Sequence, residues 1–143
     1  MIAIDTNIVV RFLTGDDAKQ YNASKKLFET EEIYIPDTVI LETEWVLRFA
    51  YEFEPNEICN AFRKLFGLAN IKLSNEFTVA QAINWYEQGL DFADAFHLAL
   101  SQNAKSLKTF DDKFVRKSKD LSQCLVEKPQ CPAHTLVWSR EAA

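Results

Sequence analysis

Short apolar segments alternate along this chain with segments of helical periodicity, and this alternation constrains the fold more than any other feature. Strands followed by helical segments indicate βαβ units, in which helices cover the faces of a parallel sheet. The expected strands are residues 1–5, 33–36, 70–74 and 106–110, and the expected helices are 6–13, a segment capped by Asp16 or Asp17 that runs to 28, 37–51, 55–67, 75–89 and 91–104. The sequence therefore predicts an α/β protein with a short, mostly parallel sheet.

Length and composition indicate one folded, soluble domain. The chain has 143 residues, of which 48% are hydrophobic, and it contains three glycines and four prolines. This composition is typical of a globular chain with one core, and no apolar stretch is long enough to span a membrane. The start of the chain does not resemble a secretory signal, and the three cysteines match no zinc-binding spacing. We expect a reduced, cytoplasmic protein with a domain at 1–127 and an irregular or appended tail at 128–143.

Acidic side chains follow or interrupt the apolar segments at four places. These are Asp5, Glu42, the pair Asp91 and Asp94, and the pair Asp111 and Asp112. A carboxylate on an apolar surface is costly unless it is neutralised or paired. Several carboxylates that meet around a hard divalent cation avoid this cost. Because Asp5 and Asp111 each end an expected strand, they are candidates for one site at the carboxyl edge of the sheet.

The helix expected at 37–51 carries two glutamates that differ in position. A helical projection places Glu44 and Arg48 on a polar face, at the (i, i+4) spacing of a surface ion pair. Glu42 falls on the opposite side, beside Val39 and Phe49. We therefore expect Glu42 to be the functional glutamate and Glu44 an ordinary surface residue. The alternative for Glu42 is a buried side chain satisfied by an arginine or a backbone N–H.

Each aspartate also has a purely structural interpretation, because aspartate is a favoured helix N-cap. Asp5 and Asp111 each precede a possible helix, and Asp91 and Asp94 have the spacing of a capping box. The capping interpretation is stronger for Asp91 than for Asp94, since the second position of a capping box prefers Glu or Gln. A set made only of oxygen ligands favours Mg²⁺ or Mn²⁺ over zinc.

The charge distribution is uneven. The net charge is −5, which argues against a nucleic-acid partner, but residues 105–119 contain six basic residues against two acidic ones. Four of the basic residues, Lys108, Lys113, Arg116 and Lys117, surround the last acidic segment and are candidates for contacts with phosphates. The alternative is a solvated helix face that takes no part in binding.

Taken in order, these motifs resemble those of the PIN domain, and more narrowly those of the VapC toxins of bacterial and archaeal toxin–antitoxin pairs. The motifs are D-T-N after the first strand, a glutamate in a helix that ends in W-V-L, D-F-A-D-A, and T-F-D after a late strand. The resemblance covers residues 1–127 and implies an α/β/α sandwich. It places the metal-binding, catalytic carboxylates at Asp5, Glu42, Asp94 and Asp111, with Thr6 and Asn7 in support. Asp91 and Asp112 duplicate neighbouring positions, and either is a candidate to share the ligation.

The resemblance implies a Mg²⁺- or Mn²⁺-dependent endoribonuclease that acts on RNA, pairs with an antitoxin protein and forms a homodimer. Water is the expected nucleophile, since the sequence has no Ser–His or Cys–His arrangement and no glycine-rich phosphate loop. One alternative is a non-catalytic PIN-like module that binds RNA or protein. A phosphatase of the haloacid dehalogenase type requires an aspartate where Asn7 stands, and a purely structural protein does not account for Glu42.

Overall fold

The structure is a computed structural model that describes residues 1–131. Seven helices lie in this part of the chain: α1 (Thr6–Thr14), α2 (Ala18–Thr30), α3 (Asp37–Phe49), α4 (Pro55–Phe66), α5 (Glu76–Glu87), α6 (Phe92–Leu100) and α7 (Asp112–Lys117). Its five short strands are β1 (Ile2–Ala3), β2 (Ile33–Tyr34), β3 (Ile71–Lys72), β4 (Ser106–Lys108) and β5 (Leu125–Glu127). The predicted tail at 128–143 lies mostly outside the described residues.

The strands form two separate parallel sheets. One has the order β1-β2-β3, with Ile2 opposite Ile33 and Ile33 opposite Ile71. The other pairs β4 with β5, and Leu107 lies opposite Val126. The predicted α/β class with parallel strands is confirmed. The expectation that β1 and β4 share one sheet edge is wrong for this structure, because no ladder joins them.

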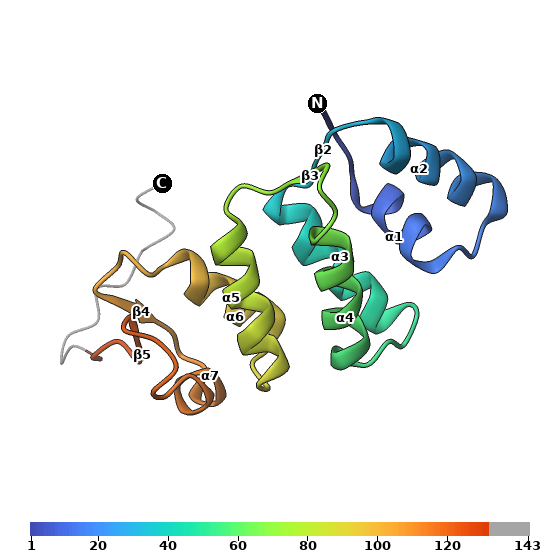
Figure 1. The fold of residues 1–143 in the computed structure, drawn as a ribbon. Coiled ribbons are helices and arrows are strands. Elements are labelled where there is room, and N and C mark those ends of the chain that lie inside the picture. The colour runs from blue at the N-terminus through green and yellow to red at the C-terminus, as the bar shows by residue number, and fades with distance from the viewer. Residues whose placement is uncertain (132–143) are drawn as a thin grey trace, which may run out of the picture.

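Helices α3 to α6 occupy the middle of the molecule, and the two sheets lie away from each other (Figure 1). Helix α5 packs along α6, and α4 lies beside α3 and α5. The centre of the core is aromatic: Phe62 and Phe92 are fully buried, with ring centroids 5.7 Å apart. Figure 1 places the α1–α2 pair at one end and the β4–β5–α7 unit at the other. No helix of residues 1–131 has both the length and the apolar character needed to cross a membrane.

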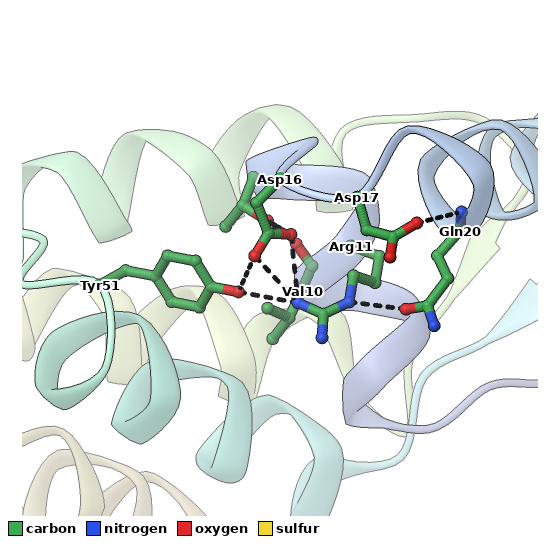
Figure 2. Close-up of polar contacts among 7 residues, drawn as sticks. Val10, Arg11, Asp16, Asp17, Gln20 and Tyr51 are labelled. Carbon is green, nitrogen blue, oxygen red and sulfur yellow. Dashed lines mark hydrogen bonds and ion pairs between the residues drawn. The ribbon is translucent and has the colours of Figure 1, made fainter.

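A polar cluster fixes the turn between α1 and α2 against the end of α3 (Figure 2). Asp16 accepts hydrogen bonds from the Tyr51 hydroxyl at 2.6 Å and from Thr14 Oγ1 at 2.9 Å. The Arg11 guanidinium bonds Asp16 at 3.1 Å, the Tyr51 hydroxyl at 2.8 Å and Gln20 at 2.7 Å. Because Tyr51 comes from a distant part of the chain, this cluster ties the first two helices to the central ones.

Side chains close in sequence set most helix starts. Asp5 caps α1, Asp17 caps α2, Asn75 caps α5 and Asp91 caps α6, each accepting a backbone N–H three residues ahead. Asp17, and not Asp16, is therefore the cap of α2. Helix α7 follows Asp111, as the capping interpretation of that residue expects, whereas β5 was not predicted.

Candidate active site

Three of the predicted aspartates line one cavity. Asp91, Asp94 and Asp111 border a space of about 520 Å³ together with the side chains of Lys113 and Lys117. Asp91 and Asp94 lie at the start of α6, and Asp111 lies at the start of α7. The segment between α6 and α7, which includes β4, therefore brings Asp111 back to the N-terminal end of α6, where Asp91 and Asp94 lie.

The carboxylates of this cavity influence one another. Burial raises the pKa of the Asp94 carboxyl, and the negative charges of Asp91 and Asp111 raise it further. Asp94 is only half-buried, and its side chain forms no hydrogen bond with residues 1–131. A positive ion in the cavity would lower the repulsion among these groups.

The capping interpretation is correct for Asp5, Asp91 and Asp111, but Asp94 does not complete a capping box, because its side chain forms no hydrogen bond with residues 1–131. Oδ2 of Asp91 accepts the N–H of Asp94 at 3.3 Å, and Oδ1 of Asp111 accepts the N–H groups of Lys113 and Phe114 at 2.9 and 3.2 Å. Oδ1 of Asp5 accepts the N–H of Ile8 at 3.3 Å. A cap occupies only part of a carboxylate, because each oxygen can accept two hydrogen bonds. Capping and ion binding are therefore compatible at these positions.

Asp5 does not join the acidic cavity in this structure. It caps α1, whereas Asp111 caps α7, and these helices lie on opposite sides of the central helices (Figure 1). Within residues 1–131, no three acidic, histidine or cysteine side chains are arranged to hold a metal ion. The expected convergence of Asp5, Glu42, Asp94 and Asp111 is therefore not met, and the cause is the separation of the β1 and β4 sheets.

The predicted faces of α3 are reversed. Glu44 is buried, with 3% of its surface exposed, whereas Glu42 is exposed. The helix turns Ile40 and Leu47 inward together with Glu44, and it exposes the aromatic side chain of Trp45. The prediction was wrong because the inward face meets a polar partner, Tyr86 of α5, and does not meet a purely apolar surface.

Glu42 nevertheless lies close to the acidic cavity. It lines a second space of about 750 Å³, next to the first, and Arg48 and Asp91 border both. The structure thus brings Glu42 near Asp91, and Asp91 near Asp94 and Asp111. Asp5 is the one predicted ligand that stands apart.

Of the residues predicted to support the site or to bind RNA, some line the acidic cavity and others lie away from it. Lys113 and Lys117 line the acidic cavity, and Lys117 Nζ donates to the Gly89 carbonyl at 3.0 Å. Lys108 forms an ion pair with Glu127 on the adjacent strand, and Asp112 forms one with Lys128. Neither Lys108 nor Asp112 borders the cavity, and neither do Thr6, Asn7 and Arg116. Thr6 is buried, whereas Asn7 and Arg116 are exposed.

Residues 2–120 match the sequence profile of the PIN domain family. This chain belongs to the PIN domain family. A search of curated proteins gives no match. Among solved structures, the crystal structure of Mycobacterium tuberculosis VapC20, described as a sarcin–ricin-loop-cleaving toxin, is similar over 80% of this chain and 92% of that chain, with 20% identity and a TM-score of 0.40. The family assignment rests on the sequence match.

A network of three side chains beside the cavity of this PIN domain was not predicted from its sequence. Glu44, Arg48 and Tyr86 form a hydrogen-bonded group between α3 and α5. The (i, i+4) spacing of Glu44 and Arg48 was the available signal, but it did not reveal which face of α3 is buried.

Proposed function

We propose that this PIN domain is a metal-dependent endoribonuclease that hydrolyses RNA phosphodiester bonds. The observation that carries the proposal is the cavity in which Asp91, Asp94 and Asp111 lie beside Lys113 and Lys117. Such a cavity combines ligands for a hard cation with positive side chains that can bind a polyanion.

The type of donor at this cavity suits Mg²⁺ or Mn²⁺, although residues 1–131 hold no group of three ligands already arranged around an ion. All the candidate ligands are carboxylate oxygens, which these ions prefer. The raised pKa of Asp94, caused by burial and then by Asp91 and Asp111, is the electrostatic penalty that a divalent cation would relieve. We propose that Asp94 and Asp111 hold the ion, with Asp91 or Asp112 able to share the ligation.

Asp5 and Glu42 complete the proposed set, supported by Thr6 and Asn7. Glu42 reaches it through the neighbouring cavity that it shares with Asp91. Asp5 can join the set only if the two sheets change their positions relative to each other. Strand β1 is an edge of its sheet, and β4 pairs only with β5 within the described part of the chain. Asp5 would approach Asp111 if β4 came to lie beside β1, since both aspartates follow the carboxyl ends of these strands.

This arrangement suggests a separate role for the ion, for the carboxylates and for the basic side chains. A bound cation would lower the pKa of a water molecule and withdraw charge from the phosphate. The carboxylates of Asp94 and Asp111 would orient that ion, and Lys113 and Lys117 would bind the RNA backbone, together with Lys108 and Arg116 farther from the cavity. Attack by water would leave a 5′-phosphate and a 3′-hydroxyl.

We further propose, from the motifs shared with VapC proteins, that this ribonuclease is the toxin of a toxin–antitoxin pair. Its partners would be a cognate antitoxin and a second copy of the chain, and it would act in the cytoplasm. The separation of Asp5 from the other carboxylates favours a second candidate function, a non-catalytic PIN module that binds RNA.

Cleavage of single-stranded RNA distinguishes the two functions. The purified chain is incubated with end-labelled RNA in Mg²⁺, in Mn²⁺ and in EDTA, beside Asp94→Asn and Asp17→Asn. Asp17 caps α2 and lies outside the proposed site, so its variant is a matched control. We expect cleavage by the wild type and by Asp17→Asn only in the presence of a divalent ion, and none by Asp94→Asn. RNA binding without cleavage in every ion would support the non-catalytic module.

A further inference from the structure

Glu44 is a buried carboxylate to which the proposed reaction assigns no role. Its Oε2 atom accepts the Tyr86 hydroxyl at 2.8 Å and the Nε–H of Arg48 at 2.7 Å, and its Oε1 atom accepts from Nη2 of Arg48 at 3.3 Å. Burying a carboxylate is costly unless charge and hydrogen bonds compensate it. Here both oxygens have hydrogen-bond partners, and one of these partners, Arg48, carries a positive charge.

Arg48 is the partly exposed end of this network, and its guanidinium is held from several sides. Nε and Nη2 are engaged by Glu44, and Nη2 also lies 3.7 Å from Oδ1 of Asp91. The guanidinium carbon lies 4.4 Å from the centroid of the Phe49 ring. Its Nη1 group has no hydrogen-bond partner among residues 1–131, and the side chain lines the acidic cavity. A positioned guanidinium with free donors is thus present at the cavity.

A purely stabilising role explains this network poorly. An exposed (i, i+4) ion pair contributes only about 0.3–0.5 kcal/mol. A buried pair is often replaced by apolar side chains without loss of stability, because desolvation offsets the attraction. The location is more informative, since Arg48 borders both the cavity of Asp94 and Asp111 and the cavity of Glu42. A planar guanidinium is well suited to bind phosphate at such a place.

We propose that Arg48 binds a phosphate group of the RNA substrate at the acidic cavity, and that Glu44 and Tyr86 are positioning residues that hold its guanidinium in place. The inference rests on the proposed function, because it takes RNA as the substrate. It adds the guanidinium of Arg48, from α3, to the ammonium groups of Lys113 and Lys117, from α7, which line the same cavity. These three positive groups would offset the repulsion between the phosphate and the carboxylates of the cavity.

The test measures binding of a short, fluorescein-labelled single-stranded RNA as a function of salt concentration. All proteins carry Asp94→Asn and are kept in EDTA, so that the RNA is not cleaved. Arg48→Ala should weaken binding by about tenfold or more, the loss expected for a hydrogen bond to a charged group. It should also lower the slope of log affinity against log salt by about 0.7, the value for one phosphate contact on a single strand.

The positioning residues should behave differently from Arg48. Glu44→Gln and Tyr86→Phe keep the arginine charge but loosen its support, so affinity should fall while the salt slope stays near that of the parent. Arg48→Lys should retain the slope and lose affinity, since an ammonium keeps the charge but lacks the planar group that Glu44 holds in place. Arg63→Ala is the matched control, because Arg63 pairs with Glu87 and does not line the acidic cavity. It should leave both quantities unchanged.

Unchanged affinity and slope in Arg48→Ala would overturn the inference, with folding checked by circular dichroism. If that variant does not fold, Arg48→Lys and Tyr86→Phe decide, and parental affinity in both would overturn it. A wild type that cleaves RNA, combined with Arg48 variants that bind RNA normally, refutes only the inference. A parent protein that binds no RNA, with a wild type that cleaves none, refutes both the inference and the proposed function.

Discussion

Asp94 and Asp111 line the same cavity from the starts of two successive helices, and the charge of Asp111 helps to raise the pKa of Asp94. Burial makes the largest contribution to this shift, followed by Asp91. The raised pKa of Asp94 should affect both the stability of the fold and the binding of a cation, and the two effects can be measured separately.

Without divalent ions, Asp94→Asn should be more stable than the wild type at neutral pH. A carboxyl whose pKa is raised in the folded state stabilises the fold when protonated, and this contribution is lost as pH rises through the folded pKa. The asparagine variant does not suffer this loss. Thermal unfolding in EDTA should show a higher midpoint for the variant at pH 7, and the difference should disappear below about pH 3.9, the pKa of an unfolded aspartate. A lower midpoint for the variant at pH 7 would contradict the expectation.

Added Mg²⁺ should reverse this order. An ion that binds only the folded protein stabilises it by about 2.7 kcal/mol at a concentration one hundred times its Kd. We expect Mg²⁺ to raise the unfolding midpoint of the wild type and to have little effect on Asp94→Asn. Calorimetric titration of both proteins provides an independent measurement. Equal shifts in the two proteins would place the ion elsewhere.

Asp111→Asn and Asp111→Ala separate the role of Asp111 as the cap of α7 from its proposed role as a metal ligand. Asparagine is also a good N-cap, whereas alanine loses about 0.5–2 kcal/mol of capping free energy. Both variants should lose RNA cleavage, and only the alanine variant should unfold at a lower denaturant concentration. If Asp111→Asn cleaves RNA like the wild type, then Asp111 acts only as the cap of α7.

Asp5→Asn tests whether the β1 end of the molecule contributes to the site. The substitution keeps a capping side chain at α1, so stability should change little. If Asp5 is a ligand, Asp5→Asn should lose cleavage as Asp94→Asn does, while Asp17→Asn at the start of α2 stays active. Wild-type activity in Asp5→Asn would restrict the site to the cavity around Asp91, Asp94 and Asp111.

The cluster of Asp16, Tyr51 and Arg11 should contribute stability that depends on pH. The hydrogen bond from Tyr51, followed by those from Thr14 and Arg11 and the positive charge of Arg11, lowers the pKa of Asp16. A lowered pKa gives stability above the unfolded value of about 3.9, and this stability is lost as pH falls through the folded pKa. Asp16→Asn should therefore unfold more easily than the wild type at pH 7 but not at low pH. A pH-independent difference would show that the charge of Asp16 is unimportant.

Local chemistry made much of the chain predictable. The aspartates and asparagine that begin helices act on backbone groups only three residues away, so Asn75 and Asp91 could be identified without knowledge of the fold, and the cap of α2 could be narrowed to Asp16 or Asp17. The same holds for strands β1 to β4, which lie within the apolar segments predicted for them. The motif order that resembled the PIN domain was likewise a property of the sequence, and the family match at 2–120 confirms it.

Contacts between residues far apart in the chain decided which face of α3 is buried and which strands pair. Glu44 and Glu42 are equivalent in helical propensity, and the packing of α3 against distant elements, including the hydrogen bond from Tyr86, 42 residues farther along the chain, makes Glu44 the buried one. The sheet order is also a long-range property: short strands carry too few side chains to specify their neighbours, and in this structure β1 and β4 belong to different sheets. The sequence thus determined which residues cap, pair locally and carry charge, whereas tertiary packing decided which of those charges share a cavity.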